Sequence, residues 1–234
     1  MKTDFQTIYE TKRVTPSAAV ALIKSDTDIS IGMALGEPPA LLAALAARLG
    51  EHGLTDLRLW YFHSMPSAAK TVLRYDLMDY IRPHCMFMGP TERALVKRGE
   101  IDGRKTVNYV PVAFSDAPKM LSEQVAIQTF MTVVSPMDQH GFFSFGTNND
   151  YAATVARSAC RTVVEVNTNM PRVFGDSMIH ISEIDTLIEN DLPLFEMTPH
   201  KPSKVDDVIS RIIAERIPDG ACLQMGIGGL PNAV

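Results

Sequence analysis

Cysteine is scarce in this chain of 234 residues, where Cys85, Cys160 and Cys222 are the three present. Their number is odd and no two lie close together in sequence, which argues against a disulfide framework and against a zinc ribbon. Each lies in or beside an apolar run, so we expect three buried thiols with a structural role. The six histidines show none of the spacings typical of a metal site, and we expect no metal.

Long apolar runs and runs of basic charge are also missing. No apolar run approaches the roughly 20 residues that span a bilayer, and the polar start Met1–Asp4 lacks the apolar stretch of a signal peptide. We therefore expect a cytoplasmic protein that contacts no membrane. The net charge is −5 and the lysines and arginines are scattered, so we expect no nucleic-acid surface.

Segments typical of strands and of helices alternate along the chain. Between Leu41 and Leu49 the leucines recur at spacings of three and four, which predicts the apolar face of a helix. By similar criteria we expect strands at 28–31, 57–62, 85–88, 107–110, 125–133 and 162–166, and helices at 16–23, 91–97 and 151–159. This alternation predicts an α/β fold with an open, mostly parallel sheet flanked by helices. Residues 142–145 are expected to pair with 125–133 as a hairpin.

The pattern restarts near the end of the chain. Thr198–Ser203 contains two prolines and is the best linker candidate. After it come a helix with its apolar face from Val205 to Ile213, a strand at 221–225 and a glycine loop. We therefore expect the first of two related tandem domains at residues 1–200, and a linker with the start of a truncated second domain at residues 201–234. This organisation predicts the N-terminal portion of a longer protein.

The sharpest motif is the glycine segment, which reads Gly226-Ile227-Gly228-Gly229-Leu230-Pro231. Its three glycines leave no Cβ to obstruct a ligand and permit unusual backbone angles. Between a strand and a helix, the loop would aim free N–H groups at a phosphate or at the oxyanion of an attacked thioester. The alternative is a tight turn that needs glycine for steric reasons alone. No Gly-Lys-Ser/Thr follows, so the motif is not a nucleotide P-loop.

Two further loops join predicted elements. Gly32–Pro38 is a second glycine loop, and its Glu37 stands next to an expected helix start. We expect Glu37 to be a first-turn acid in solvent, favoured there by the helix dipole, and not a nucleophile. Ser135–Gly141 joins two strand-like runs, and we expect His140 to lie exposed in a turn.

Polar side chains also follow the strand at 162–166. The carboxyl ends of parallel strands line the ligand crevice of an α/β fold. Asn167, Asn169 and Arg172 could therefore contact a substrate, or they could hydrogen-bond within their own loop.

Four stretches taken together resemble the acetyl-CoA hydrolase/transferase family, which includes 4-hydroxybutyrate, succinyl and butyryl CoA-transferases. They are spread in order over nearly the whole chain, and only as a set are they specific. They are Gly32–Pro38; Ser135–Gly141 running on to Phe143–Gly146; Glu165–Arg172 with Gly175–Ser177 and Ile179–Ser182; and Gly226–Val234.

The resemblance implies a CoA-transferase-like fold built twice in tandem, with acyl-CoA bound between the halves. In the family a glutamate forms a covalent glutamyl-CoA intermediate, and a short carboxylate such as 4-hydroxybutyrate, acetate or butyrate accepts the CoA. By resemblance, the CoA-binding residues here are Gly226, Ile227, Gly228, Gly229 and Leu230. The family's glutamate lies after this loop, so no catalytic residue is expected within the chain.

The resemblance also implies the partners. CoA or acyl-CoA is expected as a substrate and not as a permanently bound cofactor. The remaining C-terminal half of the protein and further copies of the chain in a homo-oligomer are the expected protein partners. Three alternatives remain open: an acyl-CoA hydrolase, a non-catalytic CoA-binding or assembly module, and a sugar-phosphate isomerase of similar build. The isomerase needs an acid/base pair in the glycine-loop cleft, and the sequence offers none that is convincing.

Overall fold

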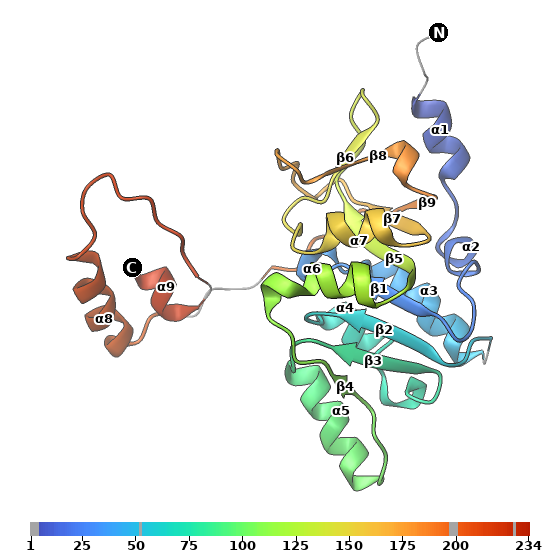
Figure 1. The fold of residues 1–234 in the computed structure, drawn as a ribbon, viewed down its shortest axis with the longest axis horizontal. Coiled ribbons are helices and arrows are strands. Elements are labelled where there is room, and N and C mark those ends of the chain that lie inside the picture. Colours follow the sequence, from blue (N-terminus) through green and yellow to red (C-terminus); the bar gives the residue numbers. More distant parts are fainter. Residues whose placement is uncertain (1–4, 52, 197–200, 227) are drawn as a thin grey trace. The chain divides into compact units, whose positions relative to one another are not determined.

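The structure is a computed structural model that describes residues 5–51, 53–196, 201–226 and 228–234. The chain divides into two compact units (Figure 1), Met1–Leu194 and Phe195–Val234. The first unit carries the sheet and both hydrophobic cores.

The first unit is built on seven strands in the order β4-β3-β2-β1-β5-β7-β9. Every neighbouring pair in this sheet runs parallel. The predicted α/β fold with an open, mostly parallel sheet is therefore confirmed. The strands are β1 (Asp28–Ile31), β2 (Leu57–Tyr61), β3 (Ile81–Cys85), β4 (Asn108–Tyr109), β5 (Ile127–Val134), β7 (Thr162–Val166) and β9 (Thr186–Glu189).

Helices cover both faces of this sheet and enclose two hydrophobic cores. Val163 packs into one core and Val164 into the other, because successive side chains of a strand point to opposite faces. The predicted leucine face from Leu41 to Leu49 is fully buried in the first core. The first core takes side chains from α2 (Pro16–Val20), α3 (Pro39–Gly50), α4 (Pro66–Lys70) and α5 (Pro90–Ile101), and the second from α1 (Phe5–Lys12), α6 (Ala117–Lys119) and α7 (Ala152–Ser158).

The helix starts follow the chemistry of the sequence. The Thr15 hydroxyl accepts the Ala18 N–H at 3.2 Å and thereby caps the helix that begins at Pro16. α2, α3, α4 and α5 all begin with proline, whose missing N–H costs nothing in the first turn. Short 3₁₀ turns span Ala34–Gly36, Tyr75–Leu77, Phe114–Asp116 and Ile181–Glu183, and one π-helical turn spans Met120–Gln124.

The predicted hairpin between 125–133 and 142–145 is wrong. β6 (Phe142–Ser144) pairs instead with β8 (Met178–His180), in a separate antiparallel ribbon. The reason is that β5 lies inside the sheet, with β1 on one side and β7 on the other. β1 pairs with residues 127–131 of β5 and β7 with residues 130–134. The backbone bonds between this stretch and β6 begin only beyond β5, where the Ser135 N–H donates to the Ser144 carbonyl at 2.8 Å.

The predicted strand at 85–88 is also misplaced, since β3 spans Ile81–Cys85. This strand contains Pro83, which stands opposite Leu59 of β2. Proline lacks the N–H of a ladder bond and normally argues against a central strand. The rule that proline disfavours a central strand therefore argued against Ile81–Cys85, although these residues form β3.

The second unit contains α8 (Lys204–Ala214) and α9 (Gly229–Ala233). The predicted helix with an apolar face beginning at Val205 is confirmed, and Ser203 caps it by accepting the Asp206 N–H at 3.2 Å. The predicted strand at 221–225 is wrong, because these residues are irregular and exposed. A strand requires a hydrogen-bonded neighbour, and the described part of this unit supplies none for them.

The three thiols differ in their surroundings. Cys85 is buried as expected, but Cys160 and Cys222 are exposed, so the expectation of three buried thiols is wrong for two of them. Cys160 lies just beyond α7 and Cys222 in the irregular segment of the second unit, where no core forms around them. Among the described residues, no helix is both long enough and apolar enough to cross a membrane.

Candidate functional site

The glycine loop after β1 folds back tightly against β5. The Gly32 N–H donates to the Met131 carbonyl at 2.9 Å. A Cβ on Gly32 would stand 2.5 Å from the carbonyl oxygen of Gly36, so the loop can close only around glycine. Ala34, between them, takes the left-handed conformation with φ of 50°. This closure turns the chain back and positions Glu37.

Glu37 is buried, so the expectation of a solvent-exposed acid is wrong. Its side chain is covered by the segment after β2, and the residue is only 3% exposed. The carboxylate accepts the Met65 N–H at 2.9 Å and the Ala68 N–H at 2.6 Å, and also the Ser67 hydroxyl. Burial raises the pKa of Glu37 to about 7, although these three hydrogen bonds oppose the rise. The Glu37 carboxylate thus accepts N–H groups at the start of α4. Because its pKa is raised, it can hold a proton near neutral pH.

A second buried carboxylate belongs to Glu92, in the first turn of α5. Its Oε1 accepts the Tyr61 hydroxyl at 2.9 Å and the Ser64 hydroxyl at 2.6 Å. Its Oε2 has no hydrogen-bond partner in the described part of the chain. Burial raises the pKa of Tyr61 well above its usual value, and the charge of Glu92 adds to this. Sequence reasoning missed Glu92, because a first-turn acid is normally a solvated helix cap.

The Nδ1 atom of His63 is likewise buried and without a partner among the described residues. His63 follows β2, and its ring meets the edge of Phe87 with centroids 5.3 Å apart. Two buried carboxylates and an imidazole therefore gather where β1, β2 and β3 end. This is the side of a parallel sheet on which ligands bind. Within the described ranges, no three His, Cys, Asp or Glu side chains are placed to hold a metal ion.

The other polar loops bond mainly to their own surroundings. Asp138 accepts the N–H groups of His140 and Phe142 at 2.8 and 2.9 Å, and His140 is exposed as expected. The Asn167 amide donates to the Leu192 carbonyl at 2.8 Å. These contacts close the turn and support the loop-bonding alternative for Asn167.

Two other candidates from the sequence are engaged in the same way. The Asn169 amide donates to the Asp191 carbonyl at 3.2 Å, and Arg172 pairs with Asp138. Both side chains hold loops of the first unit together. These contacts give no indication that Asn169 or Arg172 binds a ligand.

The predicted CoA-binding glycine segment lies in the second unit, and its glycines are not tightly packed against neighbouring atoms. Gly228 has φ of +138°, a conformation reserved for glycine. A Cβ on Gly226 or Gly229 would find its nearest neighbour 3.6 Å away. Leu230 is half-buried in α9, and Ile227 lies outside the described residues. The predicted CoA-binding role of these residues stays a prediction.

Comparison with known proteins defines the class. Residues 1–196 match the N-terminal domain of the acetyl-CoA hydrolase/transferase family. The chain belongs to this family. It is 34% identical to the 4-hydroxybutyrate coenzyme A transferase of Clostridium kluyveri, over 99% of this chain and 52% of that protein. It is 32% identical to the butyryl-CoA:acetate CoA-transferase of Anaerostipes caccae, over 98% of this chain and 51% of that protein.

Solved structures agree with this placement. RipA from Yersinia pestis shares 51% sequence identity with a TM-score of 0.95, over 98% of this chain and 54% of that one. A 4-hydroxybutyrate CoA-transferase from Porphyromonas gingivalis, at 24% identity and a TM-score of 0.79, shares the fold. The chain spans about half the length of these relatives.

Proposed function

We propose that the full-length protein moves CoA from an acyl-CoA thioester to a short carboxylate. The observation that carries this proposal is the match of nearly the whole chain to proteins named as CoA-transferases, at 32 to 34% identity. The buried carboxylates at the carboxyl ends of β1 to β3 support it, because they form a polar site where the fold binds ligands.

The proposed reaction uses a glutamate beyond residue 234. Its carboxylate attacks the thioester carbonyl and expels the CoA thiolate, which leaves an acyl-glutamyl anhydride. The thiolate then attacks the glutamyl carbonyl and releases the first carboxylate, giving a glutamyl-CoA thioester. The acceptor carboxylate attacks this thioester and expels the thiolate, and the thiolate takes the acyl group from the new anhydride. Each step breaks one carbonyl bond as it forms another.

The glycine segment is the proposed CoA contact. Backbone N–H groups would contact the CoA moiety of the substrate or the oxyanion of an attacked thioester. They would come from Gly226, Ile227, Gly228, Gly229 and Leu230. A Cβ on Gly226 or Gly229 would clash with no neighbour, so the backbone there is not tightly packed, and this supports the role. The division of the chain into residues 1–200 and a second, truncated domain from residue 201 belongs to the same proposal, as do a cytoplasmic location and a homo-oligomeric assembly.

Hydrolysis is the second candidate, because water in place of the acceptor would release free acid and CoA. The experiment is to incubate full-length protein with acetyl-CoA or butyryl-CoA, with and without a carboxylate acceptor, and to follow the thioesters by mass spectrometry. A transferase forms the acceptor's CoA ester and consumes little thioester alone. Free CoA formed at the same rate without acceptor would indicate a hydrolase, and no reaction in either mixture would indicate a binding or assembly module.

A further inference from the structure

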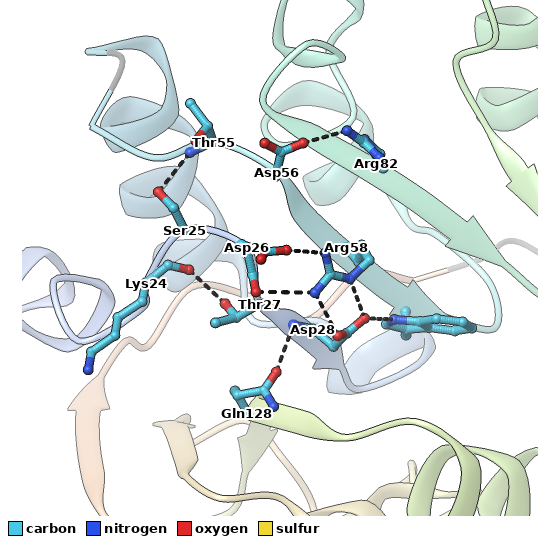
Figure 2. A network of polar contacts seen from close by, with 11 residues as sticks. Lys24, Ser25, Asp26, Thr27, Asp28, Thr55, Asp56, Arg58, Arg82 and Gln128 are labelled. Atoms are coloured by element: carbon cyan, nitrogen blue, oxygen red, sulfur yellow. Dashed lines mark hydrogen bonds and ion pairs between the residues drawn. The ribbon is translucent and has the colours of Figure 1, made fainter.

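An exposed thiol borders a small cavity at the amino ends of three neighbouring strands. The cavity has a volume of about 200 Å³ and lies where the chain enters β1, β5 and β7. This is the edge of the sheet opposite the one that gathers Glu37 and Glu92. The lining includes Leu22, Lys24, Gln128, Thr129, Cys160 and Arg161. Figure 2 shows Lys24 and Gln128 beside the amino end of β1. Because Cys160 is exposed, a reagent can reach its sulfur from solvent.

Two cations line this cavity, and no acid does. They are Lys24 and Arg161, and neither forms an ion pair with any of the described residues. One N–H of the Arg161 guanidinium donates to the Leu22 carbonyl at 3.3 Å. This contact holds the guanidinium beside the cavity while other N–H groups remain for a ligand. A cavity bordered by one sign of charge raises the local concentration of the opposite sign, so the lining favours an anion.

Uncharged donors on the inner wall favour the same kind of ligand. Thr129 is only 2% exposed, yet its hydroxyl, which lines the cavity, has no hydrogen-bond partner among residues 5–51, 53–196, 201–226 and 228–234. A buried polar group left unpaired costs about 1–3 kcal/mol, so an acceptor that enters the cavity is stabilised there. The side-chain oxygen of Gln128 accepts the Asp28 N–H at 2.8 Å, which leaves its amide N–H groups for the cavity.

We propose that Cys160 is a modification site, which forms a mixed disulfide with a small thiol that carries anionic groups. The thiol arrives as its own disulfide, and CoA disulfide and glutathione disulfide both belong to this class. The sulfur of Cys160 loses its proton to solvent and attacks one sulfur of the disulfide. A new S–S bond forms as the old one breaks, and the departing thiolate takes up a proton. Lys24, Arg161 and Thr129 bind the anionic arm. This inference is independent of the proposed function, since it requires no acyl transfer.

Cys222 supplies a comparison within the same chain. It is exposed like Cys160, but it lies in the irregular segment of the second unit, and the nearest charged residue in sequence is an acid, Asp219. If exposure alone governs reactivity, the two thiols should show the same preference among disulfides. If the cavity binds an anionic arm, Cys160 should prefer disulfides that carry one.

The test treats full-length protein with three disulfides. They are CoA disulfide, glutathione disulfide and pantethine, which keeps the pantetheine arm of CoA without the nucleotide phosphates. Peptide mass spectrometry follows the adducts at Cys160 and Cys222 with time. For each thiol, the anion preference is the rate with an anionic disulfide divided by the rate with pantethine. At low ionic strength, we expect the preference at Cys160 to exceed that at Cys222 by about tenfold for at least one anionic disulfide. About 1 M salt, where the Debye length is about 3 Å, should remove most of this difference.

Variants separate the cavity from simple exposure. Lys24→Gln combined with Arg161→Gln removes both charges and should lower the anion preference of Cys160 to that of Cys222. Thr129→Val keeps the shape of the side chain and should lower the preference by about threefold, because one hydrogen bond is lost. Lys97→Gln removes an exposed cation from α5 and is the control that should change nothing. Thermal unfolding shows whether each variant is folded. If Arg161→Gln destabilises the protein, Lys24→Gln alone should still lower the preference by about threefold.

The outcomes decide between a built site and an ordinary exposed thiol. Equal anion preferences at Cys160 and Cys222 overturn the inference. A preference that survives the loss of both cations overturns it as well. Selectivity for CoA disulfide alone would support a site for the nucleotide phosphates, and selectivity for glutathione disulfide alone would support a site for carboxylates. Failure of the same protein to transfer CoA would count against the proposed function and leave this inference standing.

Discussion

The carboxylate of Glu165 accepts the backbone N–H of Leu41 at 3.1 Å. It also accepts the N–H of Ala40 at 3.0 Å, and the Asn190 amide donates to its other oxygen. Glu165 stands in β7 and is fully buried, while Ala40 and Leu41 open α3. A residue more than 120 positions away thus satisfies the N–H groups that every helix start leaves unpaired.

Removing this carboxylate should weaken the first unit. We expect Glu165→Leu to lower the free energy of unfolding by about 2 kcal/mol, because two N–H groups and one amide would be left buried without an acceptor. Trp60 is the only tryptophan and lies in β2, so urea titration followed by its fluorescence reports on this unit. Glu123→Gln, an exposed acid, is the control. An equal effect of both changes would contradict the role of Glu165.

Asp28 is the centre of a second polar network (Figure 2), which ties β1 to β2. Arg58 binds it with two N–H groups at 2.8 and 2.9 Å, and Trp60 donates to it at 2.7 Å. Burial alone would raise the pKa of Asp28, but the hydrogen bonds from Arg58 and Trp60 lower it below its usual value. Its contribution to stability is therefore present above pH 4 and is lost as the pH falls through the lowered pKa.

We expect Asp28→Asn to cost about 1–2 kcal/mol at neutral pH, because the paired Arg58 is largely shielded from solvent. Asp76→Asn is a matched control, since the Arg74–Asp76 pair is more than half exposed on both sides and should contribute almost nothing. Urea unfolding at pH 7 measures both. Near pH 3 the difference between wild type and Asp28→Asn should shrink, and a constant difference would contradict the proposed protonation.

Glu37 predicts a pH dependence of the opposite sign. Its pKa is raised to about 7 in the folded protein, against an ordinary value near 4.5. The folded state therefore holds a proton that the unfolded state releases, and this contribution to stability is full below pH 4.5 and falls as the pH rises toward 7. We expect wild type to lose up to about 3 kcal/mol over that interval relative to Glu37→Gln. Parallel stability profiles of the two proteins would show that Glu37 titrates normally.

The thiols should react in the order of their exposure. Cys160 and Cys222 are exposed and should react quickly with a disulfide reagent in the native protein. Burial, with a further contribution from the charge of Glu92, raises the pKa of Cys85 to about 12, so Cys85 should react only after unfolding. The number of reactive thiols, before and after unfolding in urea, is measured from the chromophore that the reagent releases. A Cys160→Ser variant, with one fast thiol fewer, is the control.

The glycine segment can be tested without straining the backbone. Any side chain at Gly228 would be strained by its φ of +138°, whereas a Cβ on Gly226 would make only an ordinary contact, 3.6 Å from Pro231. We expect Gly226→Val in the full-length protein to lower kcat/KM for acyl-CoA by at least about tenfold, since the methyl groups would obstruct a ligand. Thermal stability should not change. Gly50→Val, where a Cβ meets nothing within 4 Å, should keep full activity. Equal activity of the two variants would remove the segment from CoA binding.

Much of the fold was predictable because its signals are local. The strands at 28–31 and 162–166 and the leucine face of α3 follow from runs of apolar residues and their spacing. The helix start at Thr15 and Pro16 follows from capping chemistry. The family was also predictable, because four short stretches in a fixed order identify it even though none of them does so alone.

The tertiary structure alone decided which of two neighbours a segment would pair with and which polar side chains would be buried. Phe142–Ser144 pairs with Met178–His180, while β5 pairs with β1 and β7 inside the sheet. Glu37 is predicted from the sequence as a helix-start acid in solvent, and Glu92 is not singled out at all, yet the fold buries both. Glu92 Oε2 has no hydrogen-bond partner among the described residues. Pairing and burial depend on residues far away along the chain, so the sequence by itself determined the elements and the family, while long-range packing determined the site.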